Sequence, residues 1–184
     1  MELKDMSLEE LWKLFPIILS PHNPEWKIWA DNEIQSLSAL LAPYYSPTIN
    51  HIGSTAVPDI MAKPIVDILV EMPDDCDWRE VKNILEGSGY ICMSESVQRM
   101  SFNKGYTPAG YADKVFHIHI HAMGDNDEIY FRDFLRRNPS VAKEYETLKL
   151  SLLPKYRNDR DGYTEAKTYF INRVMTSAKR NDTD

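Results

Sequence analysis

The sequence predicts an α+β fold in which a mixed β-sheet of about five strands is flanked by helices and followed by a C-terminal helical block. Three observations support this prediction. Short apolar and alternating segments are concentrated between about residues 46 and 122, helical periodicity precedes them, and it returns from about residue 126 to residue 180. Strands gathered in one region are typical of a mixed sheet, whereas strands that alternate with helices are typical of a parallel one.

Composition indicates one domain and limits the class of partner. The chain has 184 residues, 43% of them hydrophobic, which suffices for one core, so we expect a single domain over residues 1–184. The formal net charge of -7 and the lack of a basic run disfavour a polynucleotide partner but not a mononucleotide. No signal peptide or long apolar segment is recognisable, which predicts a cytoplasmic protein with no membrane partner. Cys76 and Cys92 lack metal-ligand spacing, and the sequence does not define the oligomeric state.

Two helices are predicted before the first strand. The pattern Ser7-Leu8-Glu9-Glu10 is a capping box that opens a short amphipathic helix ending before Pro16. Its apolar face is expected to pack on the core or to act as a lid. Asn23 is expected to cap a longer helix with Pro24 at its first position, and an apolar stripe extends this helix to Pro43.

The remaining elements follow from periodicity and from the positions of glycine and proline. Strands are expected over residues 46–52, 65–70, 90–93, 97–102 and 114–122, with a short helical turn after the first strand and a loop over residues 105–113. Asp77 is expected to cap a helix that ends at Gly87 and Gly89. Three further helices are expected over residues 128–137, 139–153 and 163–179, with boundaries marked by Pro139, Pro154 and Gly162.

Gly53-Ser54-Thr55 is the first candidate binding segment. It follows a predicted strand and opens a turn, so its backbone N–H groups and the hydroxyls of Ser54 and Thr55 suit a phosphate. The alternative is an ordinary tight turn capped by a hydroxyl, which the spacing alone also permits.

Asp67 is the second candidate, because it lies in the middle of the apolar strand predicted over residues 65–70. A carboxylate in such a strand costs free energy unless it meets a cation, a metal or several donors. The alternative is a structural pair with an arginine or with backbone groups. Period two places Ile65 and Leu69 beside Asp67 on one face, so neither adjacent same-face position holds a second acid.

His117, His119 and His121 alternate with apolar residues in the strand predicted over residues 114–122. The three imidazoles therefore share one face, where one or two of them are able to ligate a metal. The alternatives are a histidine face that lines solvent and a zinc site, which needs a further ligand from elsewhere in the chain.

Basic side chains of the C-terminal helices are candidates for anion binding. The apolar positions 131, 134 and 135 leave Arg132 and Arg136 four residues apart on one helix face, where like charges favour an anion. The alternative is a solvated face balanced by Asp133 and Glu128. Three lysines lie on the following helices: Lys143, Lys149 and Lys167. Each of them either faces a cleft or is an ordinary exposed helix residue.

Taken together, these segments resemble the GrpB family, a group of proteins assigned to the nucleotidyltransferase superfamily. The joined pieces HIGSTAVP (residues 51–58) and KPIVDI (residues 63–68) carry the family-specific signal. The resemblance covers most of the chain in the expected order. It also includes residues 21–26, the His119 strand, residues 131–136, and the helix positions Tyr145, Lys149, Tyr163 and Lys167.

The resemblance implies a nucleotidyltransferase fold in which Gly53 and Ser54 hold a triphosphate and Asp67 holds a divalent metal, Mg²⁺ or Mn²⁺. The superfamily strand usually presents two acids two residues apart, and here Ile65 and Leu69 flank Asp67 instead. His119, on a strand expected beside Asp67, is the candidate to replace the missing ligand. Four basic residues would neutralise the phosphates: Lys63, Arg132, Arg136 and Lys167.

Three functions remain open at this point. The first is metal-dependent transfer of a nucleotidyl group from a nucleoside triphosphate to a small-molecule or protein acceptor, with Asp67 and His119 as catalytic and metal-binding residues. The second is a non-catalytic nucleotide- or coenzyme-binding module. The missing acid favours it, and relatives of the GrpB family occur joined to dephospho-coenzyme A kinase. The third is a zinc hydrolase that uses the histidine strand.

Overall fold

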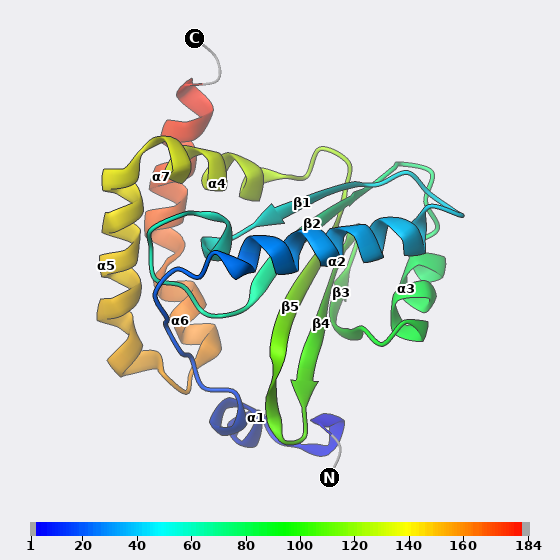
Figure 1. Cartoon of the computed structure of the whole chain (residues 1–184), viewed down its shortest axis with the longest axis horizontal. Coiled ribbons are helices and arrows are strands. Elements are labelled where there is room, and N and C mark those ends of the chain that lie inside the picture. Colours follow the sequence, from blue (N-terminus) through cyan, green and yellow to red (C-terminus); the bar gives the residue numbers. More distant parts are fainter. Residues whose placement is uncertain (1–2, 182–184) are drawn as a thin grey trace.

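The computed structural model describes residues 3–181 and contains a five-stranded sheet (Figure 1). The strands lie in the order β1-β2-β5-β4-β3; β2 and β5 pair in parallel, and the other neighbours pair antiparallel. Their bounds are β1 Thr48–Ile52, β2 Val66–Met72, β3 Ile91–Ser96, β4 Arg99–Thr107 and β5 Gly110–Ala122. The predicted mixed sheet of about five strands is confirmed.

Helices lie against the sheet and beside it. In Figure 1, α2 crosses the sheet, whereas α4, α5, α6 and α7 gather next to its β1 side. The bounds are α1 Leu8–Leu14, α2 Glu25–Leu41, α3 Trp78–Gly87, α4 Asp127–Arg137, α5 Pro139–Tyr156, α6 Arg160–Ala166 and α7 Thr168–Asn181, with 3-10 turns η1 Leu3–Asp5 and η2 Ser54–Ala56. The predicted α+β class and the C-terminal helical block are therefore confirmed.

The main core fills the space between the sheet and the helices α2 and α3. Alternate residues of β2 and β5 point into it, and each buried isoleucine or valine contributes about 1.5–3 kcal/mol relative to an exposed one. The sheet side of this core consists of Val66, Ile68, Val70, Met72, Met100, Phe102, Phe116, Ile118 and Ile120. The period-two pattern consequently sends Asp67 and the three histidines of β5 to the opposite face of the sheet.

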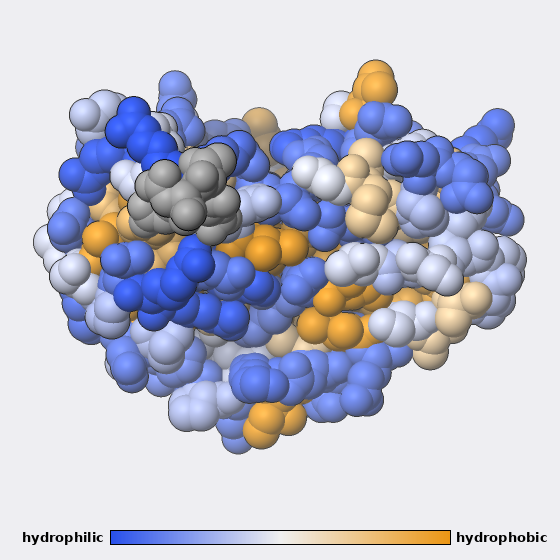
Figure 2. Space-filling view, turned by 90° about the horizontal axis from the view of Figure 1, so that it is seen from above, coloured by the Kyte–Doolittle hydropathy of each residue, from blue (hydrophilic) through white to orange (hydrophobic). Residues whose placement is uncertain are grey.

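A second core joins the C-terminal helices to the segment after η2. Phe134 and Leu135 of α4 pack with Tyr145 of α5 and with α7, and Val57 and Ile60 pack into the same cluster. The segment between the Gly53-Ser54 turn and β2 is thereby held against the helical block. Seen from above, hydrophilic residues cover most of the surface and hydrophobic ones form separate patches (Figure 2). Within residues 3–181, no helix is both long and apolar enough to cross a membrane.

Helix caps follow the sequence with one difference. Ser7 and Glu10 form the predicted capping box of α1, and Asp77 caps α3 by accepting from two backbone N–H groups. The Asn23 side chain accepts from the Glu25 N–H at 3.0 Å as expected. However, α2 begins at Glu25, so Pro24 is the residue before the helix and not its first residue.

The predicted loop over residues 105–113 is wrong, because β4 and β5 continue into it as a hairpin. Tyr106 pairs with Tyr111 and Thr107 with Gly110. Gly105 and Pro108 suggest a break, but Gly105 has φ +90° and forms a bulge that bends the strand without ending it. The preceding hairpin also differs, since β4 begins at Arg99 and the exposed residues 97–98 form its turn.

The C-terminal boundaries at Pro154 and Gly162 are also wrong. Pro154 lies inside α5 and Gly162 lies inside α6, and the expected helix over residues 163–179 is divided into α6 and α7 at Lys167. A Cβ at residue 162 would lie 2.8 Å from Tyr156 Cδ1, so this glycine permits close packing of α6 on the end of α5. Tertiary packing, which the local pattern does not encode, sets these boundaries.

Replacing Gly105 with alanine is expected to lower the free energy of unfolding by about 1–3 kcal/mol, because the positive φ disfavours a side chain. The added Cβ would also lie 3.1 Å from Val115 Cα and even closer to the Lys114 carbonyl oxygen. Chemical denaturation measures the change. Gly87→Ala is the control, since its Cβ would meet nothing within 4 Å. Equal stability of the two variants would contradict the role of Gly105.

Candidate functional site

A cavity of about 270 Å³ lies where the Gly53-Ser54 turn, the polar face of β2 and β5, and the helices α5 and α6 meet. Residues distant in sequence converge there. The polar lining consists of Ser54, Thr55, Lys63, Asp67, His117, His119, Tyr145, Lys149, Arg160, Tyr163, Thr164 and Lys167. The structure thus brings together seven of the nine predicted site residues, counting Gly53, Ser54, Thr55, Lys63, Asp67, His119 and Lys167.

Gly53 brings the turn against Asp67. Its φ is +73°, and a Cβ built on it would lie 2.7 Å from Asp67 Oδ2. Only glycine accommodates both the left-handed conformation and this close approach without strain. The glycine therefore permits the close approach of turn and carboxylate that the family resemblance implies.

Asp67 lies between two imidazoles of β5. Its Oδ1 is 3.0 Å from His119 Nε2 and 3.5 Å from His117 Nδ1. Burial opposes ionisation of Asp67, but hydrogen bonds and positive charge from the two histidines outweigh it and hold its pKa well below the usual range. Burial lowers the pKa of His117, whereas for His119 the bond to Asp67 outweighs burial and raises the pKa. These pKa shifts favour protonation of His119 over protonation of His117. The protonated His119 ring then donates a hydrogen bond to Asp67.

The polar network continues from His117 to a phenol and an arginine that sequence reasoning missed. Tyr106 Oη lies 2.6 Å from His117 Nε2, and Arg160 donates to the hydroxyls of Tyr106 and Tyr111 at 3.0 Å each. Tyr106 falls in the segment mistaken for a loop, and Arg160 precedes the predicted start of its helix. Residues 110–114 do not alternate between apolar and polar, so periodicity did not reveal that the hairpin extends to the two tyrosines.

Three lysines supply most of the positive charge. Lys149 Nζ donates to Ser54 Oγ at 3.1 Å and to the Met61 carbonyl, which fixes it beside the turn. Burial, together with repulsion from neighbouring lysines, lowers the pKa of Lys149 and of Lys167 to about 7. Burial also lowers the pKa of Lys63. Among the described lining residues Asp67 is the only acid, so a bound anion would stabilise the charged form of these lysines.

Arg132 and Arg136 lie in a different cavity, of about 590 Å³, which α2, β1, η2 and α4 enclose. Arg132 Nη1 donates to the His51 carbonyl at 2.8 Å, and Arg136 Nε donates to the Ala56 carbonyl at 2.7 Å. Thr55 lines both cavities, and its hydroxyl bonds to His51 Nε2 at 2.8 Å. The prediction that Arg132 and Arg136 lie in the same site as Lys63 and Lys167 is therefore wrong, because the arginines and the lysines line different cavities.

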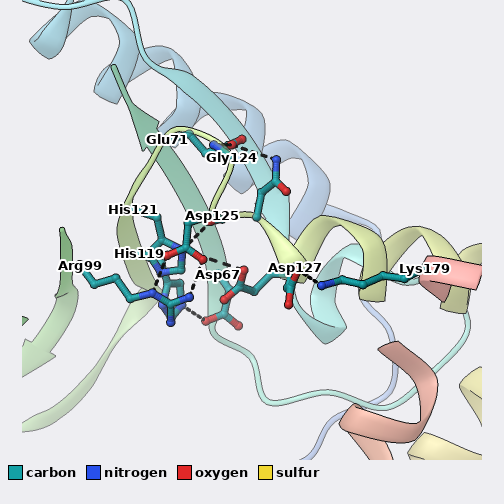
Figure 3. A network of polar contacts seen from close by, with 11 residues as sticks. Asp67, Glu71, Arg99, His119, His121, Gly124, Asp125, Asp127 and Lys179 are labelled. Atoms are coloured by element: carbon teal, nitrogen blue, oxygen red, sulfur yellow. Dashed lines mark hydrogen bonds and ion pairs between the residues drawn. The ribbon is translucent and has the colours of Figure 1, made fainter. Parts of the chain in front are cut away.

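The other acids and imidazoles on this face of the sheet are already paired. Glu71 accepts from the Gly124 N–H at 3.0 Å and from the Asn126 side chain at 2.9 Å. His121 bonds to the Asp125 carbonyl at 2.8 Å, while the Asp125 carboxylate binds Arg99 (Figure 3). Across the described part of the chain, no three histidine, cysteine or acidic side chains are grouped to hold a metal.

Asp67 alone fits a hard divalent cation. Mg²⁺ is commonly held by one or two carboxylates together with substrate phosphates and water, and Asp67 Oδ2 faces the Gly53 turn where phosphates would lie. His119 Nε2 lies 3.0 Å from Asp67 Oδ1, so this nitrogen would have to leave that contact to serve as a metal ligand. A two-carboxylate metal site is not formed.

The fold and the cavity together define an α+β protein with a basic pocket built on a glycine turn. The family model described as "GrpB protein" matches residues 16–177, so the chain belongs to the GrpB family. Among curated proteins, it is 36% identical to "UPF0157 protein PA4798" of Pseudomonas aeruginosa, over 86% of this chain and 66% of that one. It is 35% identical to "Glutamate-rich protein GrpB" of Alkalihalophilus pseudofirmus, over 86% and 94%.

A solved structure supports the fold directly. The crystal structure of the conserved protein GrpB from Enterococcus faecalis superposes with a TM-score of 0.76 and 29% identity, and covers 91% of this chain and 100% of that one. The Cid1 poly(U) polymerase is more distant, with a TM-score of 0.48 and 12% identity over 81% of this chain and 45% of that one. That similarity is too low to carry an argument about function. The chain spans only about two thirds of the Pseudomonas relative.

Proposed function

We propose that the cavity binds the polyphosphate of a nucleoside triphosphate and that the protein transfers the nucleotidyl group to an acceptor. One observation carries the proposal: three lysines and Arg160 line the same cavity as the Gly53-Ser54 turn, while Asp67 is the sole carboxylate among the described lining residues. A ligand with several negative charges would balance this excess of positive charge, and a triphosphate has them.

The residues present suit such a transfer in distinct ways. Lys63, Lys149 and Lys167 would neutralise the charge that develops on the departing pyrophosphate, and the N–H groups of the turn would orient it. An acceptor oxygen would bond to the α-phosphorus as the bond to the β-phosphate oxygen breaks. Asp67 would hold Mg²⁺ or Mn²⁺, which when bound stabilises charge on the phosphate oxygens. His119 would keep the Asp67 carboxylate oriented.

Pyrophosphate release tests this proposal. The purified protein would be incubated with each of ATP, GTP, CTP and UTP, with Mg²⁺ or Mn²⁺, against a library of small-molecule and protein acceptors. A preceding thermal-shift screen identifies the nucleotide, because a ligand that binds only the folded form raises the apparent stability. Transfer is supported by metal-dependent pyrophosphate release with labelled acceptor, and it is contradicted by saturable nucleotide binding without any release.

A non-catalytic nucleotide- or coenzyme-binding module is the second candidate. The specific observation in its favour is that Asp67 is the one acid among the described residues that line the cavity and that His117 and His119 both lie against its Oδ1. An adenine-containing ligand would then bind through the lysines alone. Calorimetry separates the two functions, since a module binds equally well with and without a divalent metal.

Binding of a triphosphate is expected to weaken as the pH rises above about 7. In the free cavity, Lys149 and Lys167 have pKa values of about 7. Bound phosphate favours the charged ammonium groups and raises both pKa values, so binding takes up protons above pH 7 and none well below it. Affinity should therefore fall by up to about tenfold per pH unit for each lysine. Calorimetry at pH 8 in two buffers of different ionisation enthalpy measures the uptake, and zero uptake would contradict the prediction.

A further inference from the structure

The cavity that contains Arg132 and Arg136 is not used by the proposed transfer. It is about 590 Å³, large enough for a small organic molecule, and it lies beside the edge strand β1 between α2 and α4. Thr55 contributes to its wall as well as to the wall of the lysine cavity. The two cavities are therefore adjacent, and Thr55 lies in the wall of both.

The two guanidinium groups are held rigidly in this cavity. Backbone carbonyls fix them, because Arg132 donates to the oxygen of His51 and Arg136 to that of Ala56. An arginine fixed in this way loses little side-chain entropy when it binds an anion. Arg132 is only 12% exposed, whereas Arg136 is 42% exposed and is accessible from solvent.

The positive charge of this pair is only partly balanced. Both arginines share one carboxylate, that of Asp133, which lies 2.7 Å from Arg132 Nε but 3.8 Å from Arg136 Nη1. The two other charged residues of the lining, Lys27 and Asp31, pair with each other at 2.6 Å and cancel. One positive charge is left over.

The histidines of the lining do not supply the missing negative charge. His51 bonds to Thr55, and burial, with repulsion from both arginines, lowers its pKa to about 4, so it is neutral at pH 7. His22 Nδ1 is buried and has no hydrogen-bond partner among residues 3–181. Ile34, Ile49 and Pro58 provide apolar walls. The lining thus offers cationic donors and an apolar surface.

We propose that this cavity is a second anion site, separate from the lysine cavity, which binds a small molecule whose phosphate or carboxylate group pairs with Arg136 and Arg132. The apolar walls accommodate the rest of that molecule. The two cavities have different basic residues, so an anion in one does not use the cationic side chains of the other. This inference does not depend on nucleotidyl transfer.

The test follows the side-chain Nε–Hε signals of the arginines by NMR while inorganic phosphate or benzoate is added to the full chain. Arg136→Gln assigns the Arg136 signal and removes the charge, while its amide is still able to donate to the Ala56 carbonyl. Arg137→Gln is the matched control, because Arg137 is adjacent on α4 but lines neither cavity. Lys167→Met removes charge from the lysine cavity alone.

We expect saturable shifts of the Arg136 signal, affinity at least tenfold weaker in Arg136→Gln, and wild-type affinity for this site in Arg137→Gln and Lys167→Met. Tighter binding of phosphate would assign a phosphate ester, and tighter binding of benzoate would assign a carboxylate with an apolar body. The proposal is overturned if neither anion shifts the signal, if Lys167→Met abolishes the shift, or if Arg137→Gln weakens binding as much as Arg136→Gln. Absence of triphosphate binding alongside these shifts would refute the proposed transfer but not this site.

Discussion

Replacing Asp67 with asparagine is expected to lower the rate of pyrophosphate release by about 10³-fold or more, because it removes the one carboxylate found among residues 3–181 in the lining of the lysine cavity. The asparagine oxygen still accepts from His119 at the Oδ1 position, so the fold should remain intact. Binding of the metal-free triphosphate should be unchanged or tighter, since a negative charge beside the phosphates is lost. Steady-state assays with metal and calorimetry without metal measure these two effects.

Glu71→Gln is the matched control for this experiment. Glu71 is on the same strand and the same face as Asp67, but it lines neither cavity and its Oε1 accepts from Gly124 and Asn126. The amide oxygen of glutamine keeps these bonds, so turnover should stay within about twofold of the wild type. If Asp67→Asn retains turnover, or if both variants lose it equally, Asp67 is not the site carboxylate.

Replacing Lys167 with methionine is expected to weaken triphosphate binding by about 10- to 100-fold while leaving thermal stability unchanged or slightly higher. A charge-assisted hydrogen bond contributes about 1.5–3 kcal/mol, which corresponds to this loss of affinity. Stability should not suffer, because burial and the nearby Lys63 already disfavour the charged form of Lys167. Methionine also retains the contact with the Tyr163 ring, over which Nζ lies 4.6 Å from the centroid.

Lys155→Met serves as the control for Lys167. Lys155 makes a similar contact, with Nζ 4.8 Å from the Tyr156 ring centroid, but it is exposed and outside the cavity. Calorimetry and thermal unfolding of both variants would separate loss of the anion site from a general effect of charge. Equal affinity losses in the two variants would show that the lysine cavity does not hold the phosphates.

The accuracy with which sequence patterns predict the structure differs between elements. Period two in residues 114–122 correctly assigned His117, His119 and His121 to one face, because side chains alternate across any strand. Reasoning from glycine and proline as element boundaries failed at Gly105, where a glycine marks a bulge inside a strand, and at Pro154 and Gly162, which lie inside helices. Glycine and proline report local freedom or restraint, but only packing decides whether an element ends there.

By itself, the sequence determined the α+β class, the order of the strands along the chain, the Gly53 turn and the isolated acid at Asp67. These features depend on local periodicity and on residue type, which are readable without contacts. The tertiary structure alone decided which basic residues share a cavity. It placed Lys63, Lys149, Lys167 and Arg160 in the cavity that the turn lines and put Arg132 and Arg136 in a neighbouring cavity. The packing of α4, α5 and α6 decides which basic residues share a cavity. The sequence shows which residues lie on one face of a helix, but only the packing of neighbouring elements shows what that face meets.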